Sequence, residues 1–215
     1  MQNREAILKF WNQVVKVHSP EIDEWIKQEN LYLRKIIKKN SIILDVGFGN
    51  GDTIMKIKNV AKKIVGIDNN TEKFDNIKKR LLEFGNIELF CEDAKDMHFE
   101  DNAFDYVICM GNTFGNLGKA QEEAINEMKR VVKINGKIVI SVYSENALPK
   151  RLEIYKRAGL TYEIISEDGT VLLGEETISE QFSRKKLTSV FNRAKLKSKI
   201  IELTPITYIC ELRKT

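Results

Sequence analysis

The sequence lacks the features that mark membrane-bound, secreted and disulfide-stabilised proteins. No apolar run approaches the length of a membrane-spanning helix, and an acidic residue, Glu5, stands where a signal peptide would begin its apolar stretch. The three cysteines, Cys91, Cys109 and Cys210, are far apart and form no Cys-x-x-Cys pair. We therefore expect free thiols, no metal centre, no membrane partner and a cytoplasmic location.

Histidine and net charge are also scarce, which limits the chemistry that the sequence indicates. His18 and His98 are the only histidines, and we expect both in surface or loop positions rather than as catalytic bases. The formal net charge is +4, which neither requires nor excludes an anionic partner such as nucleic acid. The composition, with 42% hydrophobic and 31% charged residues among 215, suits one globular domain with a substantial core.

The first two thirds of the chain alternate helical and strand patterns. Segments with apolar residues at helical spacing are separated by short apolar runs that end in turns. This alternation implies βαβ units, a parallel sheet with helices on both faces, and a ligand crevice outside the carboxyl ends of the strands. The expected helices are 21–39, 52–60, 71–84 and 119–132, with Ser19 and Thr71 as N-caps, and the expected strands are 42–46, 63–67, 87–91, 104–110 and 137–143, the last after an Asn135-Gly136 turn.

The last third follows a different pattern. A helix over 148–158 should end at Gly159, and the Glu167-Asp168-Gly169 turn between two apolar segments predicts a hairpin. Ser183 should cap a helix that reaches Ala194. The final join is too short for a parallel crossover, so the last two strands should be antiparallel. The expected divisions are one domain over 1–215, a helical cap in 1–40, a hairpin insertion in 160–182 and closing strands at 199–203 and 206–212.

A glycine loop between the first strand and the next helix is the most informative segment. Gly47, Gly49 and Gly51 allow the backbone to approach a ligand closely, although such turns also occur for packing alone. A dinucleotide fingerprint would need a glycine at position 52, where Asp52 stands, and Asp45 is badly placed for a pyrophosphate. Asp45 suits a cationic group, such as the ammonium or sulfonium end of S-adenosylmethionine.

Two further carboxylates follow the next strands of the expected sheet. Asp68 ends the second strand, about twenty residues after the loop, where it can accept hydrogen bonds from both hydroxyls of a ribose. Asp93 follows the third strand and can accept from the exocyclic amine of an adenine, although a simple turn residue would also suit that position. With Asp45 and the glycine loop, these residues converge on one crevice.

Residues 40–143 resemble the class I S-adenosylmethionine-dependent methyltransferases. Asp45-x-Gly47-x-Gly49-x-Gly51 is similar to the first motif of that family, and the segments 99–108 and 132–137 are similar to those around its fourth and fifth strands, with Asn135 at a usual glycine position. The resemblance implies an α/β, Rossmann-like, doubly wound seven-stranded sheet, mostly parallel with an antiparallel last strand. The cofactor contacts that it implies are Tyr32, Asp45, Gly47, Phe48, Gly49, Gly51, Asp68, Asn69, Asp93, Ala94, Met110 and Gly111, of which Tyr32, like Trp25, would equally suit packing on the core.

The loop after the fourth strand should face the methyl acceptor. It lacks the Asn/Asp-Pro-Pro-Tyr/Phe motif of enzymes that methylate base amines, and Gly111-Asn112-Thr113-Phe114 is similar to the Gly-Asn-Ser-Phe of glycine N-methyltransferase and its relatives. By that similarity Asn112 would bind the substrate, with Asn116 nearby and Tyr143 orienting the acceptor. A turn that only shapes the loop, and packing of Tyr143, are the alternatives. In this superfamily an insertion such as 160–182 often covers the active site as a lid.

The predicted function is transfer of a methyl group to a small-molecule acceptor, with an amine as the expected class. In-line displacement at a sulfonium carbon needs alignment and exclusion of water more than a catalytic histidine, so the shortage of histidine is no objection. Two alternatives stay open: an RNA or protein methyltransferase that uses the basic segment 184–199, and a scaffold that binds the cofactor without catalysis. The sequence does not indicate an oligomeric state.

Overall fold

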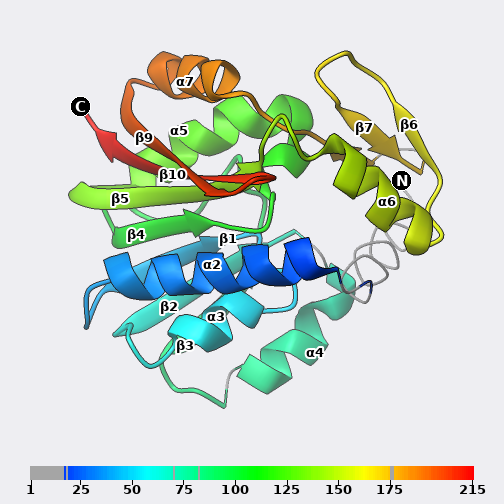
Figure 1. The fold of residues 1–215 in the computed structure, drawn as a ribbon. Coiled ribbons are helices and arrows are strands. Elements are labelled where there is room, and N and C mark those ends of the chain that lie inside the picture. The colour runs from blue at the N-terminus through cyan, green and yellow to red at the C-terminus, as the bar shows by residue number, and fades with distance from the viewer. Residues whose placement is uncertain (1–16, 18, 70, 82, 175–176) are drawn as a thin grey trace.

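The computed structural model describes residues 17, 19–69, 71–81, 83–174 and 177–215, and a seven-stranded sheet lies at its centre (Figure 1). The strand order is β3-β2-β1-β4-β5-β10-β9, and β10 is antiparallel to both of its neighbours. The predicted α/β fold with an antiparallel ending is therefore confirmed. The strands are β1 (Ile42–Val46), β2 (Lys63–Asp68), β3 (Ile87–Cys91), β4 (Phe104–Cys109), β5 (Val132–Tyr143), β9 (Leu196–Thr204) and β10 (Thr207–Lys214).

Helices cover both faces of the sheet, as expected for right-handed βαβ units (Figure 1). On one face Leu33, Ile54 and Leu81 are fully buried in an apolar cluster with strand residues such as Ile43. Successive strand residues point to opposite faces, so Asp45, two residues after Ile43, lies on this same face. The helices on this face are α2 (Pro20–Ile36), α3 (Asp52–Ile57) and α4 (Thr71–Leu81), and those on the other are α5 (Gln121–Val131), after two short 3-10 turns, η1 (Phe114–Asn116) and η2 (Gly118–Ala120), and α7 (Arg184–Arg193).

Most predicted boundaries hold within a few residues, and β5 shows the largest difference. It begins at Val132 rather than at Lys137, because Phe104 pairs with Val132 and Tyr106 pairs with Lys137. Residues 133–136 of β5 therefore lie opposite the single residue Asp105. The predicted Asn135-Gly136 turn therefore lies in a bulge within β5 and does not precede the strand.

Helix ends follow the expected capping chemistry at three of four positions. The backbone N–H of Ile22 donates to Ser19 Oγ at 3.3 Å, and that of Lys186 donates to Ser183 Oγ at 3.2 Å. Gly159 adopts a φ of +70° just after α6 (Leu148–Arg157). α4 begins at Thr71, as predicted, and the capping role of Thr71 stays a prediction because the residue before it lies outside the described residues. Of the helical cap expected in 1–40, the structure describes α2, and residues 1–16 lie outside the described residues.

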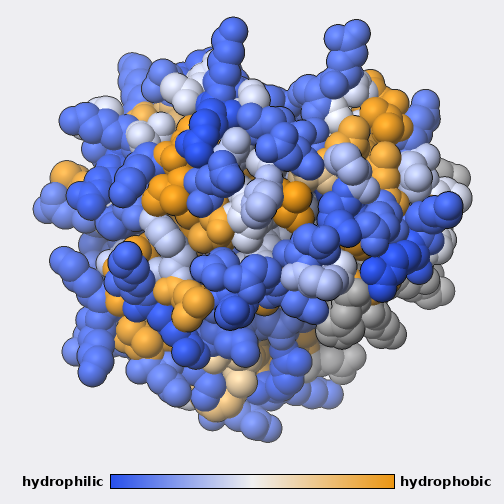
Figure 2. Space-filling model, in the orientation of Figure 1, coloured by the Kyte–Doolittle hydropathy of each residue, from blue (hydrophilic) through white to orange (hydrophobic). Residues whose placement is uncertain are grey.

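A second, smaller unit follows β5 at the edge where the parallel strands end (Figure 1). The predicted hairpin is present as β6 and β7, and a third strand, β8, extends it into a sheet that the sequence did not indicate. Figure 2 shows hydrophobic side chains over this corner, where Ile164 and Ile165 of the hairpin are each 47% exposed. This covering unit consists of α6 (Leu148–Arg157), β6 (Tyr162–Ile164), β7 (Val171–Leu173) and β8 (Thr177–Ser179).

Scarce residue types lie where their environments explain them. Cys109 and Cys210 are buried and Cys91 is exposed, and all three thiols are free. His98 is an exposed loop residue that pairs with Glu92, as the sequence suggested, whereas His18 lies outside the described residues. Within the described part of the chain, no helix combines the length and apolar character that crossing a membrane requires.

Candidate functional site

The glycine loop lies at the carboxyl end of β1 and is held by the neighbouring strand. The backbone N–H of Gly47 donates to the Ile67 carbonyl of β2 at 2.8 Å. Gly47 has a φ of +75°, and a Cβ at this position would lie 2.3 Å from Thr113 Cγ2. Only glycine therefore allows the β1 loop and the β4 loop to approach this closely.

Asp68 closes the loop from the end of β2. Its Oδ2 accepts the backbone N–H of Gly49 at 2.9 Å, so this carboxylate already orients the glycine loop. Asn69 follows it in an exposed position. The structure thus brings Asp68 and the loop together at the edge where the sequence placed them.

Asp45 is the most unusual group at this edge. Its side chain is only 1% exposed, and its Oδ2 has no hydrogen-bond partner among the described residues. Burial, followed by the charges of Asp68 and Glu29, raises the pKa of the Asp45 carboxyl to about 8. A buried carboxylate oxygen without a donor is costly, so this site is incomplete without a cationic or donating ligand.

Glu29 of α2 is a second buried acid that sequence analysis missed. It is 6% exposed, and its Oε1 accepts the backbone N–H of Gly111 at 3.2 Å. Burial raises the pKa of Glu29 to about 7, against hydrogen bonds from Ser141, Gly111 and Trp25 that favour the charged form. The available signal was position: Glu29 lies four residues after Trp25 and four before Leu33, on the buried stripe of the helix.

The loop after β4 is bound tightly to the rest of the protein. Gly111 and Asn112 both have left-handed backbone, with φ of +61° and +62°. The Asn112 side chain is 1% exposed: its Oδ1 accepts the backbone N–H of Tyr143 at 3.1 Å, and its Nδ2 donates to the Glu180 carbonyl at 3.2 Å. Asn112 therefore ties the β4 loop to β5 and to the segment after β8, and Asn116 Oδ1 lies 3.3 Å from the same amide nitrogen.

Two predicted contacts lie at the edge of the sheet but make other interactions. Asp93 follows β3, where its Oδ1 accepts the backbone N–H of Lys95 at 3.1 Å and its other oxygen lies 3.5 Å from the Lys95 ammonium. Ala94 is partly buried beside it. Tyr143 ends β5 but is 4% exposed, with its ring 4.8 Å from that of Trp25.

Three other predicted contacts pack in or against the core. The Tyr32 hydroxyl donates to Glu211 in β10, which pairs with Lys137 in the middle of β5 and lies opposite Val139, so Tyr32 is not brought to the carboxyl edge. Phe48 is 6% exposed and packs 6.4 Å from the ring of Phe74. Met110 is also 6% exposed, at the end of β4 next to Gly111.

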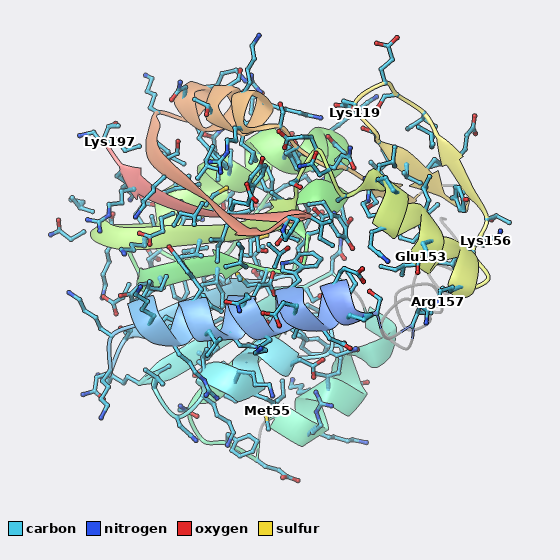
Figure 3. All side chains as sticks on the ribbon, in the orientation of Figure 1. Met55, Lys119, Glu153, Lys156, Arg157 and Lys197 are labelled. Atoms are coloured by element: carbon cyan, nitrogen blue, oxygen red, sulfur yellow. The ribbon has the colours of Figure 1, made fainter. Side chains whose placement is uncertain are left out.

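The covering unit is held together by a buried arginine that the sequence did not single out. Arg151 of α6 is 0% exposed, and its guanidinium donates to the Gly169 carbonyl at 2.9 Å, to Gln181 Oε1 at 3.0 Å and to the Ser179 carbonyl. On the exposed side of the same helix, Glu153 and Arg157 form an ion pair at 3.7 Å (Figure 3).

Comparison with known proteins agrees with this arrangement. The sequence pattern of the methyltransferase domain matches residues 43–136. The chain is 31% identical over 160 residues to a ubiquinone/menaquinone biosynthesis C-methyltransferase of Rickettsia prowazekii, covering 69% of this chain and 62% of that protein. It is 34% identical over 163 residues to a demethylmenaquinone methyltransferase of Staphylococcus aureus, covering 71% and 66%.

The fold agrees as well. The crystal structure of an S-adenosylmethionine-dependent methyltransferase from Clostridium acetobutylicum superposes with a TM-score of 0.72 at 11% identity, over 99% of both chains. The chain belongs to the class I S-adenosylmethionine-dependent methyltransferase superfamily. It spans only 62% of the length of the Rickettsia relative.

The described residues fit the cofactor that gives this superfamily its name. S-adenosylmethionine carries an ammonium and a sulfonium. A positive group of this kind would compensate the buried Asp45 oxygen that lacks a hydrogen-bond partner among the described residues. The glycine loop leaves no side chain between its backbone and a ligand. Among the described residues, no cluster of three or more His, Cys, Asp or Glu side chains could hold a metal ion.

Proposed function

We propose that the chain transfers a methyl group from S-adenosylmethionine to a small-molecule acceptor. The observation that carries this proposal is the buried oxygen of Asp45, which has no hydrogen-bond partner within the described part of the chain and lies beside a glycine loop at the carboxyl edge of the sheet. A nicotinamide dinucleotide does not suit this edge, because its pyrophosphate would meet Asp45.

Each acid has a role in holding the cofactor under this proposal. Asp45 would compensate the positive end of the cofactor, and Asp68, at the end of β2, would accept hydrogen bonds from the ribose hydroxyls. Asp93 would accept a hydrogen bond from the adenine amine. Its carboxylate would then serve both the adenine and Lys95, which it already contacts. Met110 and Gly111 would border the cofactor at the end of β4.

The work left to the protein is alignment and exclusion of water. The bound cofactor supplies a methyl group on a sulfonium, which is an activated leaving group. The chain's own residues align the acceptor with that methyl, and the covering unit of α6 and β6–β8 lies at the edge where water must be kept out.

For the acceptor, we propose an aromatic ring carbon of a quinone precursor. The support is similarity to the two relatives named for quinone methylation. The expectation of an amine rested on Asn112 as a substrate contact, and its amide is engaged with Tyr143 and Glu180. We assign Asn112 to positioning the loop, and we keep amines as the alternative class.

Binding measurements test the cofactor part of the proposal. In isothermal titration, S-adenosylmethionine and S-adenosylhomocysteine should bind and NAD should not. Asp68→Ala should weaken binding at least about tenfold, because it removes a charged hydrogen-bond acceptor. Asp101→Ala, which removes an exposed aspartate paired with Arg130 before β4, is the matched control and should bind normally. Absence of binding by the unmodified chain would refute the proposal.

An acceptor screen tests the substrate part. Purified protein and labelled cofactor are incubated with demethylated quinones in their reduced, quinol form, and with amines, amino acids, tRNA and protein. We expect methylation of the quinol ring carbon, with the C–H bond replaced by a C–CH3 bond and the proton released. Products only from amines would support the alternative class, and products only from tRNA or protein would support a role for the basic segment 184–199. Binding of cofactor without product from any acceptor would support the scaffold.

A further inference from the structure

We propose that Glu29 and Asp45 together form a two-carboxylate receptor for the positively charged end of S-adenosylmethionine. This inference rests on the proposed function and deepens it, because it adds a residue outside the glycine motif to the cofactor site. It assigns to α2, a helix that precedes the first strand, a direct part in binding.

The two acids reach one place from opposite directions. Asp45 comes from β1 and lies on the sheet face that α2 covers, since it has the parity of Ile43. Glu29 comes down from α2 to the backbone of Gly111 at the end of β4. β1 and β4 are adjacent parallel strands, so the Asp45 and Gly111 positions lie at the same edge.

Among the residues that the structure describes, the charged and titratable groups around the pair offer it no positive partner. Asp68 from β2 and the Cys109 thiol from β4 lie within electrostatic reach of Asp45, and both are acidic groups. On β5, the Tyr143 hydroxyl lies within electrostatic reach of Glu29, and it too is an acidic group. Arg151 lies 5.1 Å from the Tyr143 ring, but its guanidinium is hydrogen-bonded to the covering unit.

A purely structural role for Glu29 would leave part of this arrangement unexplained. A carboxylate that only accepted hydrogen bonds from Gly111, Ser141 and Trp25 could be replaced by a neutral amide without the cost of a buried charge. A second acid next to the unpartnered oxygen of Asp45 adds to that cost. A ligand with both an ammonium and a sulfonium would compensate two carboxylates.

Such a receptor makes cofactor binding release protons. Burial raises the pKa of Glu29 to about 7 and that of Asp45 to about 8, so in the free protein the pair holds protons near neutral pH. A bound cation favours the charged carboxylates, lowers both pKa values and drives the protons off. Affinity should therefore rise as pH increases from 6 to 8.

The test is titration calorimetry of the full chain with S-adenosylmethionine at pH 6, 7 and 8, in buffers of different ionisation enthalpy. We compare the unmodified protein with Glu29→Gln and with a control, Glu24→Gln, which makes the same change at an exposed position of the same helix. The ligand's own amino group titrates in this range, with an ordinary pKa of about 8, so the difference between variants isolates Glu29.

We expect Glu29→Gln to weaken S-adenosylmethionine binding about tenfold at pH 8 and less than about threefold at pH 6, and to reduce proton release. S-adenosylhomocysteine, which lacks the sulfonium charge, should lose less affinity. Glu24→Gln should match the unmodified protein.

Unchanged affinity and proton release in Glu29→Gln, in a chain that still binds S-adenosylmethionine, would overturn the inference and leave the proposed function standing. Equal losses for the two ligands would also contradict a receptor matched to both charges. Asp45→Asn is a second variant, which changes the other carboxylate of the pair. It should also weaken binding and reduce proton release, so a loss seen in Glu29→Gln need not be assigned to misfolding. Circular dichroism checks that both variants fold.

Discussion

The glycine-loop region and the covering region of this protein are built in different ways. In the first, residues 45–52 and Asp68 form a site from backbone groups and a carboxylate only about twenty positions apart in sequence. In the second, contacts join distant segments, as when Asn112 Nδ2 donates to the Glu180 carbonyl after β8 at 3.2 Å across 68 positions. The first region is a motif of residues close together in sequence, whereas the contacts of the second form only when distant segments are brought together by folding.

This difference assigns separate tasks to the two regions. The loop region presents a fixed backbone surface and an uncompensated acid, which suits one cofactor. The covering unit is held together by Arg151 and is joined to the β4 loop by Asn112, which suits adaptation to different acceptors without a change in cofactor binding. Mutations in one region should therefore leave the other largely intact.

The largest expected effect is in the loop region. Gly47→Val should destabilise the fold by about 3–5 kcal/mol, because it forces a left-handed backbone on a β-branched residue and places Cβ against Thr113. Gly49→Ala, at a left-handed position with open space, should cost only about 1–2 kcal/mol. Urea unfolding measures both. Equal losses for the two variants would mean that the loops are not in close contact.

The next effect separates the covering region from the cofactor. Arg151→Met should destabilise the protein by about 2–4 kcal/mol, because it leaves the buried carbonyls of Gly169 and Ser179 without a donor. Hydrogen exchange should increase within 160–182, while affinity for S-adenosylmethionine changes less than about threefold. If cofactor affinity fell sharply while the fold remained stable, the proposed separation of tasks would be contradicted.

The buried acid of α2 predicts an unusual pH dependence of stability. The folded chain keeps the Glu29 proton up to a pKa of about 7, whereas the unfolded chain loses it near 4.5. Below 4.5 both states hold the proton, so stability falls as pH rises from about 4.5 to 7. Between pH 5 and 7.5 the unmodified protein should lose about 2–3 kcal/mol more than Glu29→Gln. Parallel pH profiles in denaturant unfolding would show that Glu29 is not buried as described.

The smallest effect concerns the loop after β4. Asn112→Ala should cost about 1–2 kcal/mol, because it removes the hydrogen bonds to Tyr143 and Glu180. Cofactor affinity should be spared and turnover should fall, since the loop loses its position. A fall in turnover with unchanged thermal stability would instead favour Asn112 as a direct substrate contact.

The same contrast explains which features could be predicted from sequence. The positions of the strands along the chain, the glycine loop and Asp68 follow from local periodicity and spacing, which act over a few residues. The burial of Asn112 and Arg151 could not be predicted, because both depend on the covering unit, whose third strand, β8, is only three residues long. Tyr32 shared helical spacing with Trp25, but its hydroxyl is bound to Glu211 in β10.

Glu29 lay between these cases. A charged residue in an apolar helical stripe is a visible anomaly in the sequence, and it marks either a surface position or a buried functional group. Only the contact with Gly111 distinguishes the two.

The most direct test of the central claim is calorimetric titration of S-adenosylmethionine into the unmodified chain and into Asp45→Asn at pH 8. Asp101→Asn, a change of an exposed aspartate before β4, is the control. We predict binding by the unmodified chain and the control, and a loss of at least about 30-fold in Asp45→Asn, since a buried charged contact contributes 2 kcal/mol or more. Equal affinity in all three proteins, or no binding by the unmodified chain, would contradict the account.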